Sequence, residues 1–437
     1  MRYLLLTVSF YFIDTSAKTQ HTDSLIAEIK TINKTVTDKA GGAISNRAMN
    51  IFLADKTSYL SESTDLSFYT NYVTLNSSLG KVTINHNFQK ASGTDEPIKK
   101  LLSVGVSVTL PGSFSTSFLD NRFDDGLGIL VSYKWLGKVS TRFENAVQNN
   151  SGQKKAMDAL RAGMVHSFER EVNKKLADFK MALAAVDSTD VPGQDIIKAR
   201  ELMQQDFYSA LKEASEEQFA SLQAATLTKT NNFKLISTGW TSINAYIPLL
   251  SADYFVAASL NTPFQHRHSY PLQLMLSHTR LWESAKAGRI FITLEAGLLL
   301  NNSKLSYGLN RITLAEYNSL GGTDLLHAAA LKNNNAYIGN YETYLTPSIQ
   351  GRFVYFPTNS HIGISFLIQQ SFGTHQLLNS KISIPVVLIN SKKTPAANFD
   401  FYVLLVDMSN KIKSSNTLAN KTIVGLSVGI PFSRLMF

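Results

Sequence analysis

Two stretches of alternating residues constrain this chain more than any other feature. Residues 102–110 read LSVGVSVTL and residues 424–432 read VGLSVGIPF, so a bulky apolar residue occupies every second position and mostly Gly, Ser or Thr lies between. Alternation with a period of two is typical of a β-strand whose two faces differ. A strand of a soluble sheet usually carries charges on its wet face, and these two carry none. They predict a sheet with one apolar face and one face of small, uncharged residues.

The same alternation recurs along most of the chain after residue 80. Many of these segments have the roughly 9–11 residues that a tilted strand needs to cross a bilayer. A further strand at 66–75 is a weaker candidate. The predicted strands, about twelve in number, lie at 81–89, 102–110, 127–135, 233–248, 252–262, 272–282, 290–300, 345–355, 362–368, 380–389, 399–408 and 421–432.

One long segment follows a different period. Apolar residues recur every three or four positions over 153–186 and again over 196–227, which is typical of helices. The polar stretch 187–193 between them contains Pro192 and Gly193 and predicts a turn. Because each helix carries only a narrow apolar stripe, we expect the two to pack on each other as a helical hairpin over 151–227, inserted between two strands.

The N-terminal residues have the order of a secretory signal. Arg2 precedes an apolar run at 3–13, and small residues ending at Ala17 follow it. This order predicts a signal peptide over 1–17, removed after export. Residues 18–80 then form a mixed segment, which we expect to be either a plug of the main body or a periplasmic extension.

The alternating strands predict a barrel in a membrane. Hydrocarbon offers no hydrogen-bond partners to the backbone, so a sheet in lipid must close on itself. The predicted fold is an all-β transmembrane antiparallel barrel over 81–437, with the inserted α-helical hairpin. Such barrels have short periplasmic turns and long outer loops. Counting strands backward from a periplasmic C-terminus places the short connections 283–289 and 357–361 in the periplasm, and the connection 138–232 with its hairpin at the cell surface.

The exported N-terminus, the alternating strands and the terminal GLSVGIPFSRLMF resemble a Gram-negative outer-membrane β-barrel protein. The resemblance implies an outer-membrane location, contact with outer-membrane lipids, and recognition of the last strand and Phe437 by the barrel-assembly machinery. The stretch DGLGILVSYKW is similar in style to Bacteroidota members. Counting back by twos from Phe437 gives a poor apolar face, so we expect either a bulge near Pro431 or a short tail over 433–437.

Composition excludes several kinds of chemistry. The chain has no cysteine, so it has neither disulfides nor cysteine-bound zinc. Its net charge of +9 is spread along the chain and does not form a nucleic-acid footprint. His266 and His268 are spaced to chelate a metal in an extended loop, but Arg267 between them adds unfavourable charge. We therefore predict no metal, no cofactor, no catalytic residue and no nucleic-acid partner.

Alternation also assigns side chains to the two faces of the barrel. Tyr133, Trp135 and Trp282 end strands on the apolar face and are predicted to belong to the aromatic girdle at the membrane interface. The alternation also assigns four polar side chains to the inner face: Lys134, Glu295, Gln350 and Arg352. They are predicted either to line a solute path or to form ion pairs that fill the interior.

Three functions stay open at this point. The first, which we predict, is a non-enzymatic outer-membrane barrel that passes or gates small polar solutes. The second is a closed barrel that anchors the hairpin for contact with an envelope or extracellular protein partner. The third is an outer-membrane hydrolase, for which the sequence offers no matching arrangement of nucleophile and base.

Overall fold

The structure is a computed structural model of the chain. Among its described residues, no helix is long and apolar enough to cross a membrane. The described residues are 46–60, 70–76, 81–88, 98–109, 127–143, 166, 170, 174, 177, 220–225, 227–228, 233–304, 309–312, 336–374, 376–390, 395–411 and 422–434.

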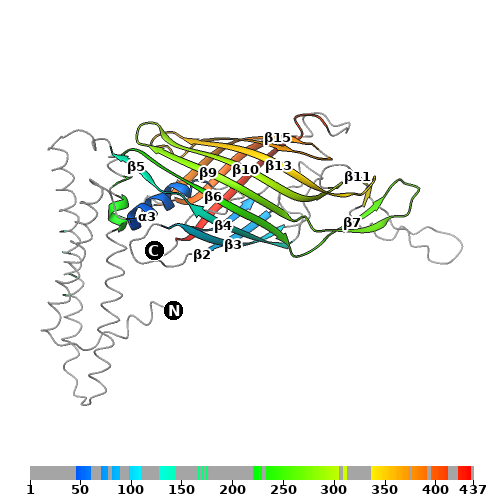
Figure 1. Ribbon diagram of the computed structural model, residues 1–437, viewed down its shortest axis with the longest axis horizontal. Helices are drawn as coiled ribbons and strands as arrows, with labels where there is room; N and C mark the ends of the chain where they lie inside the picture. The colour runs from blue at the N-terminus through cyan, green and yellow to red at the C-terminus, as the bar shows by residue number, and fades with distance from the viewer. Residues whose placement is uncertain are drawn as a thin grey trace, which may run out of the picture.

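Twelve antiparallel strands form a closed barrel (Figure 1). Each strand pairs with its neighbours in the sheet, and the ring closes where β1 pairs with β17 and where β4 pairs with β6. A short strand, β5 (Ser140–Phe143), follows β4 and pairs with the first part of β6. The barrel strands are β1 (Thr70–Asn76), β2 (Lys81–Phe88), β3 (Lys100–Thr109), β4 (Leu127–Leu136), β6 (Phe233–Pro248), β9 (Gln273–Ser284), β10 (Gly288–Asn302), β13 (Thr343–Phe356), β14 (Ile364–Ser371), β15 (Leu378–Ile389), β16 (Pro395–Leu405) and β17 (Thr422–Arg434).

The two faces of the barrel match the alternation in the sequence. Outward apolar side chains are exposed, for example Ile84 at 52%, Leu294 at 62% and Val424 at 60%. Inward neighbours such as Ser103 and Ser132 are fully buried. A continuous belt of exposed apolar side chains is unstable in water and is covered by hydrocarbon in a membrane barrel. The predicted antiparallel barrel is confirmed.

One predicted barrel strand is wrong, and a weaker candidate takes its place. The segment at 252–262 contributes β7 (Ala252–Ala257) to a separate four-stranded sheet of order β11-β12-β7-β8, beyond one end of the barrel (Figure 1). Tyr254 and Val256 alternate like barrel residues, but they pack on Tyr337 of that small sheet. The barrel instead begins with β1, before residue 81. The other strands of the small sheet are β8 (Gln265–Ser269), β11 (Asn310–Ile312) and β12 (Ala336–Ile338).

This exchange changes the end at which the long insertion leaves the barrel. The short connections after β9, β13 and β15 share one end, which we name the turn end. The opposite end, which carries 249–272 and 303–342, is the loop end. β5 ends and β6 begins at the turn end too, so the connection 144–232 leaves and re-enters the barrel there. Its predicted placement at the end opposite to the short turns is wrong, because that count included a barrel strand at 252–262.

The last strand contains the predicted bulge. In the pairing of β1 with β17, Tyr72 lies opposite Pro431 and Asn71 lies opposite Ser433, so Phe432 is an extra residue. Proline cannot donate a ladder hydrogen bond, and strands tolerate it at bulges. The bulge therefore restores pairing after the proline, while Phe437 lies outside the described residues.

Other predictions fall mainly outside the described residues. The signal peptide at 1–17 and most of the hairpin at 151–227 belong to this group. Within the hairpin region, the residues described at 166, 170, 174, 177 and 220–228 (226 excepted) are helical. The pairing of two long helices stays a prediction.

Two strands approach closely where a glycine faces an aromatic ring. A Cβ built on Gly425 would lie 2.4 Å from Cζ of Tyr402. We expect Gly425→Ala to displace this ring and to lower the free energy of unfolding by about 1–3 kcal/mol. The measurement is the unfolding midpoint of the detergent-folded barrel. Gly351→Ala is the matched control, because its Cβ would meet no atom closer than 3.9 Å; an equal loss in both variants would contradict the packing argument.

Candidate functional site: a plugged polar lumen

A helix fills the turn end of the barrel. Helix α3 (Asn46–Thr57) lies among the strand ends there (Figure 1). Ile51, Phe52 and Leu53 are consecutive and all buried. The helix is therefore buried on more than one face, unlike an amphipathic helix that packs on a surface through a single apolar face. It shares an apolar cluster with side chains of β6, β9, β10, β13 and β15, among them Phe233 and Phe356.

The end of the long insertion packs on the same cluster. Ala220, Ala224 and Leu227 are buried in it together with Phe52 and Phe233. The rings of Phe52 and Phe233 meet edge to face, with centroids 5.9 Å apart. The connection 144–232 is therefore in contact with the helix that fills the lumen.

Three charged residues join the helix to the barrel wall. The Lys56 Nζ lies 3.2 Å from Glu283 Oε1. Arg289 donates from Nε to Glu283 Oε2 at 2.6 Å and from Nη2 to Oε1 at 3.3 Å. All three side chains are largely or fully buried. We name them the Lys56–Glu283–Arg289 triad; one wall carboxylate in it holds one cation from the helix and one from the neighbouring strand.

The residues after the helix are held by hydrogen bonds to three separate places. Tyr72 donates its hydroxyl to the Ser58 carbonyl at 2.8 Å, and the Asn398 amide also donates to it. Tyr59 bonds through its hydroxyl to Nδ1 of His361 at 2.8 Å. The guanidinium of Arg289 lies 3.9 Å from the centre of the Tyr59 ring, a cation–π contact.

Burial shifts the titration of groups around the helix. It lowers the pKa of the Lys56 ammonium; Arg289 adds to this effect and Glu283 opposes it. It raises the pKa of the Tyr59 hydroxyl. The pKa of His361, whose side chain is partly exposed, is lowered, first by its partial desolvation and then by the positive charges of Arg289 and Lys56. His361 is therefore neutral near pH 7, and its Nδ1 can accept a hydrogen bond from the Tyr59 hydroxyl.

Much of the lumen wall is a buried network of small polar side chains. The hydroxyls of Ser242 and Ser277 are 2.6 Å apart, and those of Thr279 and Thr293 are 3.0 Å apart. Such pairs join inward side chains of neighbouring strands. A wall of this kind satisfies its own polar groups without charge, which leaves the few charged side chains to define the chemistry of the lumen.

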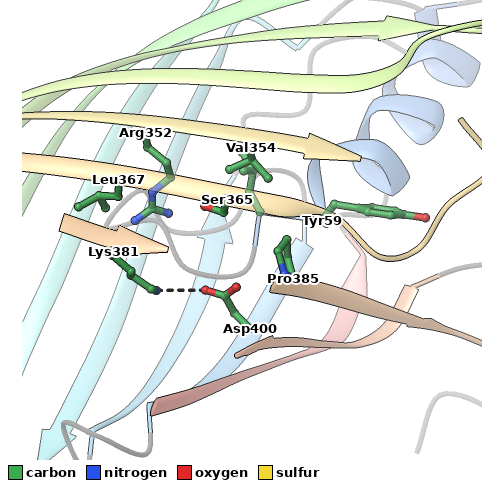
Figure 2. A pocket seen from close by; sticks show the side chains of 9 residues that line it. Tyr59, Arg352, Val354, Ser365, Leu367, Lys381, Pro385 and Asp400 are labelled. Carbon is green, nitrogen blue, oxygen red and sulfur yellow. Dashed lines mark hydrogen bonds and ion pairs between the residues drawn. The ribbon is translucent and has the colours of Figure 1, made fainter. Parts of the chain in front are cut away.

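The structure places the four predicted lumen residues on the inner side of the barrel. Lys134 and Glu295 are buried, whereas Gln350 and Arg352 are half-buried. Gln350 donates to Glu295 Oε2 at 3.3 Å. Arg352 reaches a pocket that it shares with Lys381 and Asp400 (Figure 2). Their role in a solute path stays a prediction.

The predicted girdle residues lie toward the turn end. The rings of Tyr133 and Trp135 meet edge to face at 4.7 Å, and Trp135 is 39% exposed. Trp282 is half-buried beneath the guanidinium of Arg280, 5.8 Å from its ring centre. An aromatic ring beside an arginine suits the boundary between hydrocarbon and headgroups.

His266 and His268, which are spaced to chelate a metal, lie in β8 at the loop end. The rings of His266 and His268 meet edge to face at 4.5 Å, and Arg267 between them contacts Gln265 and the ring of Tyr341. Within the part of the chain that the structure describes, no group of three or more His, Asp or Glu residues could hold a metal ion.

Sequence reasoning missed the charged residues that organise the site. Lys56, Glu283 and Arg289 come from three separate elements, and the pairing of Lys381 with Asp400 joins two neighbouring strands. Alternation does signal Lys381 and Asp400, because it places both opposite exposed apolar neighbours such as Ile382 and Phe401. No local pattern signals the triad.

No known family model matches the chain, and no curated protein matches it. Among solved structures, the NanC porin in a rhombohedral crystal form is 6% identical, with 83% of this chain and 98% of that chain covered and a TM-score of 0.28. The β domain of the Bordetella autotransporter BrkA is 7% identical, with 83% and 97% covered and a TM-score of 0.25. Similarity this low carries no functional argument, and the Bacteroidota resemblance stays a prediction. A closed barrel with an exposed apolar belt fits an outer-membrane location.

Proposed function

We propose that this protein is an outer-membrane barrel that passes small polar solutes, and that α3 gates it at the turn end. The observation that carries the proposal is the way in which α3 is held. It joins the wall through the Lys56–Glu283–Arg289 triad in addition to apolar packing. Buried ion pairs contribute little net stability compared with apolar packing, so they are a poor choice for a permanent core. They fix one position of the helix and break when water reaches them.

The strand pairing also supports a movable helix. None of the described barrel pairings involves α3, because the ring closes through β1, β17, β4 and β6. Displacing α3 therefore breaks side-chain contacts and leaves the ladder of backbone hydrogen bonds intact. Periplasmic connections of outer-membrane barrels are short, so the short connections after β9, β13 and β15 support a turn end that faces the periplasm and a loop end that faces the exterior. The 144–232 connection is then a long periplasmic insertion.

A closed barrel that serves as an anchor is the second candidate. The buried hydroxyl pairs on β6, β9 and β10 favour it, because hydroxyls that bond to each other need no water from the lumen. The anchor proposal expects a folded barrel that carries no current under any condition.

Conductance in planar bilayers tests the gate through its pH dependence. His361 has a lowered pKa while its ring faces Tyr59, Arg289 and Lys56, and an ordinary pKa of about 6.5 once α3 leaves. As pH falls through that ordinary value, His361 binds a proton more readily in the open state, with α3 displaced, than in the closed state. The closed state is therefore destabilised relative to the open state at low pH. We expect few openings at about pH 7.5 and several-fold more at about pH 5.

The matched variants are His361→Gln, which removes the pH dependence, and His278→Gln on the exposed outer face, which retains it. Current that is independent of pH in the wild type would contradict the role of His361. Absence of current at both pH values, from a barrel that shows heat-modifiable migration, would favour the anchor.

A further inference from the structure

A group of basic and aromatic side chains lies on the outer face of the barrel, toward the turn end. It spans β3, β4, β6 and β9, which are consecutive strands of the closed sheet (Figure 1). Lys100 and Arg280 are exposed, Trp135 is 39% exposed and Trp282 is half-buried. We name these four residues the basic aromatic patch.

Strand register brings the two cations of the patch to either side of β6. Lys100 lies opposite Trp135, and Trp135 lies opposite Thr241 of β6. Arg280 lies opposite Gly239, the next outward residue of β6 toward the turn end. Gly239 has no side chain, and a Cβ built on it would lie 3.5 Å from Cδ of Arg280. The stem of Arg280 therefore lies over β6, the strand that separates it from Trp135.

The positive charges of the patch have no acidic counterpart on these strands. Among the residues that the structure describes, no carboxylate is exposed on β3, β4, β5, β6 or β9. The guanidinium of Arg280 contacts the ring of Trp282, and within the described part of the chain neither Arg280 nor Lys100 forms an ion pair. His278 is hydrogen-bonded to Thr241, one outward position closer to the loop end, and is not counted in the patch.

More positive charge lies at the turn end of the same strands. Three further lysines there are exposed, namely Lys99, Lys138 and Lys234. Uncompensated charge of one sign creates a potential that attracts the opposite charge. The ligand that suits this surface is therefore an anion.

Apolar side chains continue from the patch toward the loop end. Leu102, Ile243 and Leu276 are the outward residues that follow on β3, β6 and β9, and they are 38%, 41% and 52% exposed. They belong to the apolar belt on which acyl chains pack, and tryptophans such as Trp135 and Trp282 lie at headgroup level in membrane barrels. A free anion gains nothing from the belt, so the surface suits an anionic group that carries acyl chains.

The excess of positive charge also discriminates between lipid headgroups. A zwitterionic headgroup brings its own ammonium beside the phosphate, and the described strands of the patch offer that ammonium no exposed carboxylate. A headgroup with one net negative charge brings no such cation. Attraction between anionic lipids and Lys or Arg near the membrane surface is worth about a factor of five in binding for each cation.

We infer that the basic aromatic patch binds an anionic phospholipid, such as phosphatidylglycerol. Arg280 and Lys100 contact its phosphate from the two sides of β6, and the guanidinium supplies the planar fork that suits phosphate oxygens. The acyl chains follow the apolar belt toward the loop end. The inference requires a barrel that lies in a membrane, and it does not require that the barrel conducts or that α3 moves.

The native tryptophans report the lipid beside the patch. Trp135 and Trp282 belong to it, whereas Trp240, the third tryptophan of the chain, is 2% exposed. The full chain is reconstituted in phosphatidylcholine vesicles that contain either phosphatidylglycerol or phosphatidylcholine with brominated acyl chains, at equal mole fractions. Quenching of the tryptophan fluorescence by bromine gives the relative binding of the two lipids.

We expect brominated phosphatidylglycerol to bind at least about tenfold more strongly than brominated phosphatidylcholine, because two cations contribute. Equal quenching by the two lipids would overturn the inference.

Single charge variants locate this preference. Arg280→Gln and Lys100→Gln are each expected to lower it about fivefold, since each removes one cation from the patch. Lys411→Gln removes one positive charge from an exposed residue at the loop end, and as the matched control it retains the preference. The ratio of the two lipids is taken within each variant, so a change in the fluorescence of Trp282 cancels. An equal loss in Arg280→Gln and Lys411→Gln would overturn the inference, because the net charge and not the patch would then select the lipid.

This measurement is independent of current. A barrel that is silent in planar bilayers but prefers phosphatidylglycerol would refute the pore and retain the lipid site. A conducting barrel without this preference would do the reverse.

Discussion

Glu283→Gln releases α3 and turns a mostly closed barrel into a mostly open one. The substitution removes the only carboxylate of the triad and leaves the buried cations of Lys56 and Arg289 facing each other. Breaking one partner out of a buried ion pair costs about 3–5 kcal/mol, which shifts the closed–open equilibrium by two orders of magnitude or more. The sheet keeps its hydrogen bonds, so we expect a folded barrel with greatly increased conductance.

The absence of cysteine allows the helix to be followed directly. Ala54 is 1% exposed, so the thiol of Ala54→Cys reacts with a maleimide only when α3 leaves the lumen. We expect slow labelling in the Ala54→Cys background and fast labelling when Glu283→Gln is added. Fast labelling without increased conductance would mean that α3 moves but does not gate.

Two further variants calibrate this effect. Lys56→Met keeps the apolar stem and leaves the bidentate contact of Arg289 with Glu283, so its effect is smaller than that of Glu283→Gln. Glu342→Gln changes an exposed carboxylate at the loop end and leaves conductance and labelling unchanged. If all three variants had equal effects, the triad would not be the element that holds the plug.

The faces of the barrel were predictable because they depend only on neighbouring residues. Residues 102–108 and 424–430 have the exposed and buried sides that their alternation indicates. The bulge was also predictable, since Pro431 interrupts the apolar face and Phe432 is the unpaired residue in the structure. Burial against lipid, like burial in a core, leaves a signal at every second position.

The choice of strands was less predictable. β1 reads TNYVTLN, in which Val73 and Leu75 are the only aliphatic side chains and the aromatic Tyr72 is buried, so its pattern is weak. β7 reads ADYFVA and has the better pattern, but it packs on Tyr337 outside the barrel. Alternation reports that two faces differ; it does not report which sheet the strand joins.

The charged contacts of the lumen could not be predicted from periodicity. Lys56 and Glu283 meet because α3 fills the turn end, and no local pattern marks a helix for the interior of a barrel. Arg352 was predicted as an inward residue, but its proximity to Lys381 and Asp400 depends on strand order and register. Such contacts require the closed fold before they become visible.

The corrected strand order gives a second large prediction, which concerns the insertion at 144–232. This connection joins β5 and β6 at the turn end, where the short turns after β9 and β13 also lie. Its residues 220–228 (226 excepted) include side chains that pack on the cluster around α3. If the turn end faces the periplasm, the insertion does so too, and a periplasmic partner that binds it acts directly on the helix that closes the lumen. If the turn end faces the exterior instead, the same packing couples α3 to a partner at the cell surface.

Single cysteines in the cysteine-free chain decide the orientation. Thr189→Cys lies in the predicted turn 187–193, and Leu260→Cys lies at the loop end, where Leu260 is 74% exposed. Cells are treated with a maleimide joined to a polyethylene-glycol chain too large to cross the outer membrane. We expect Leu260→Cys to be labelled on intact cells, and Thr189→Cys only after the outer membrane is permeabilised. The opposite result would invert the barrel, place α3 at the outer mouth and make the insertion accessible to extracellular partners.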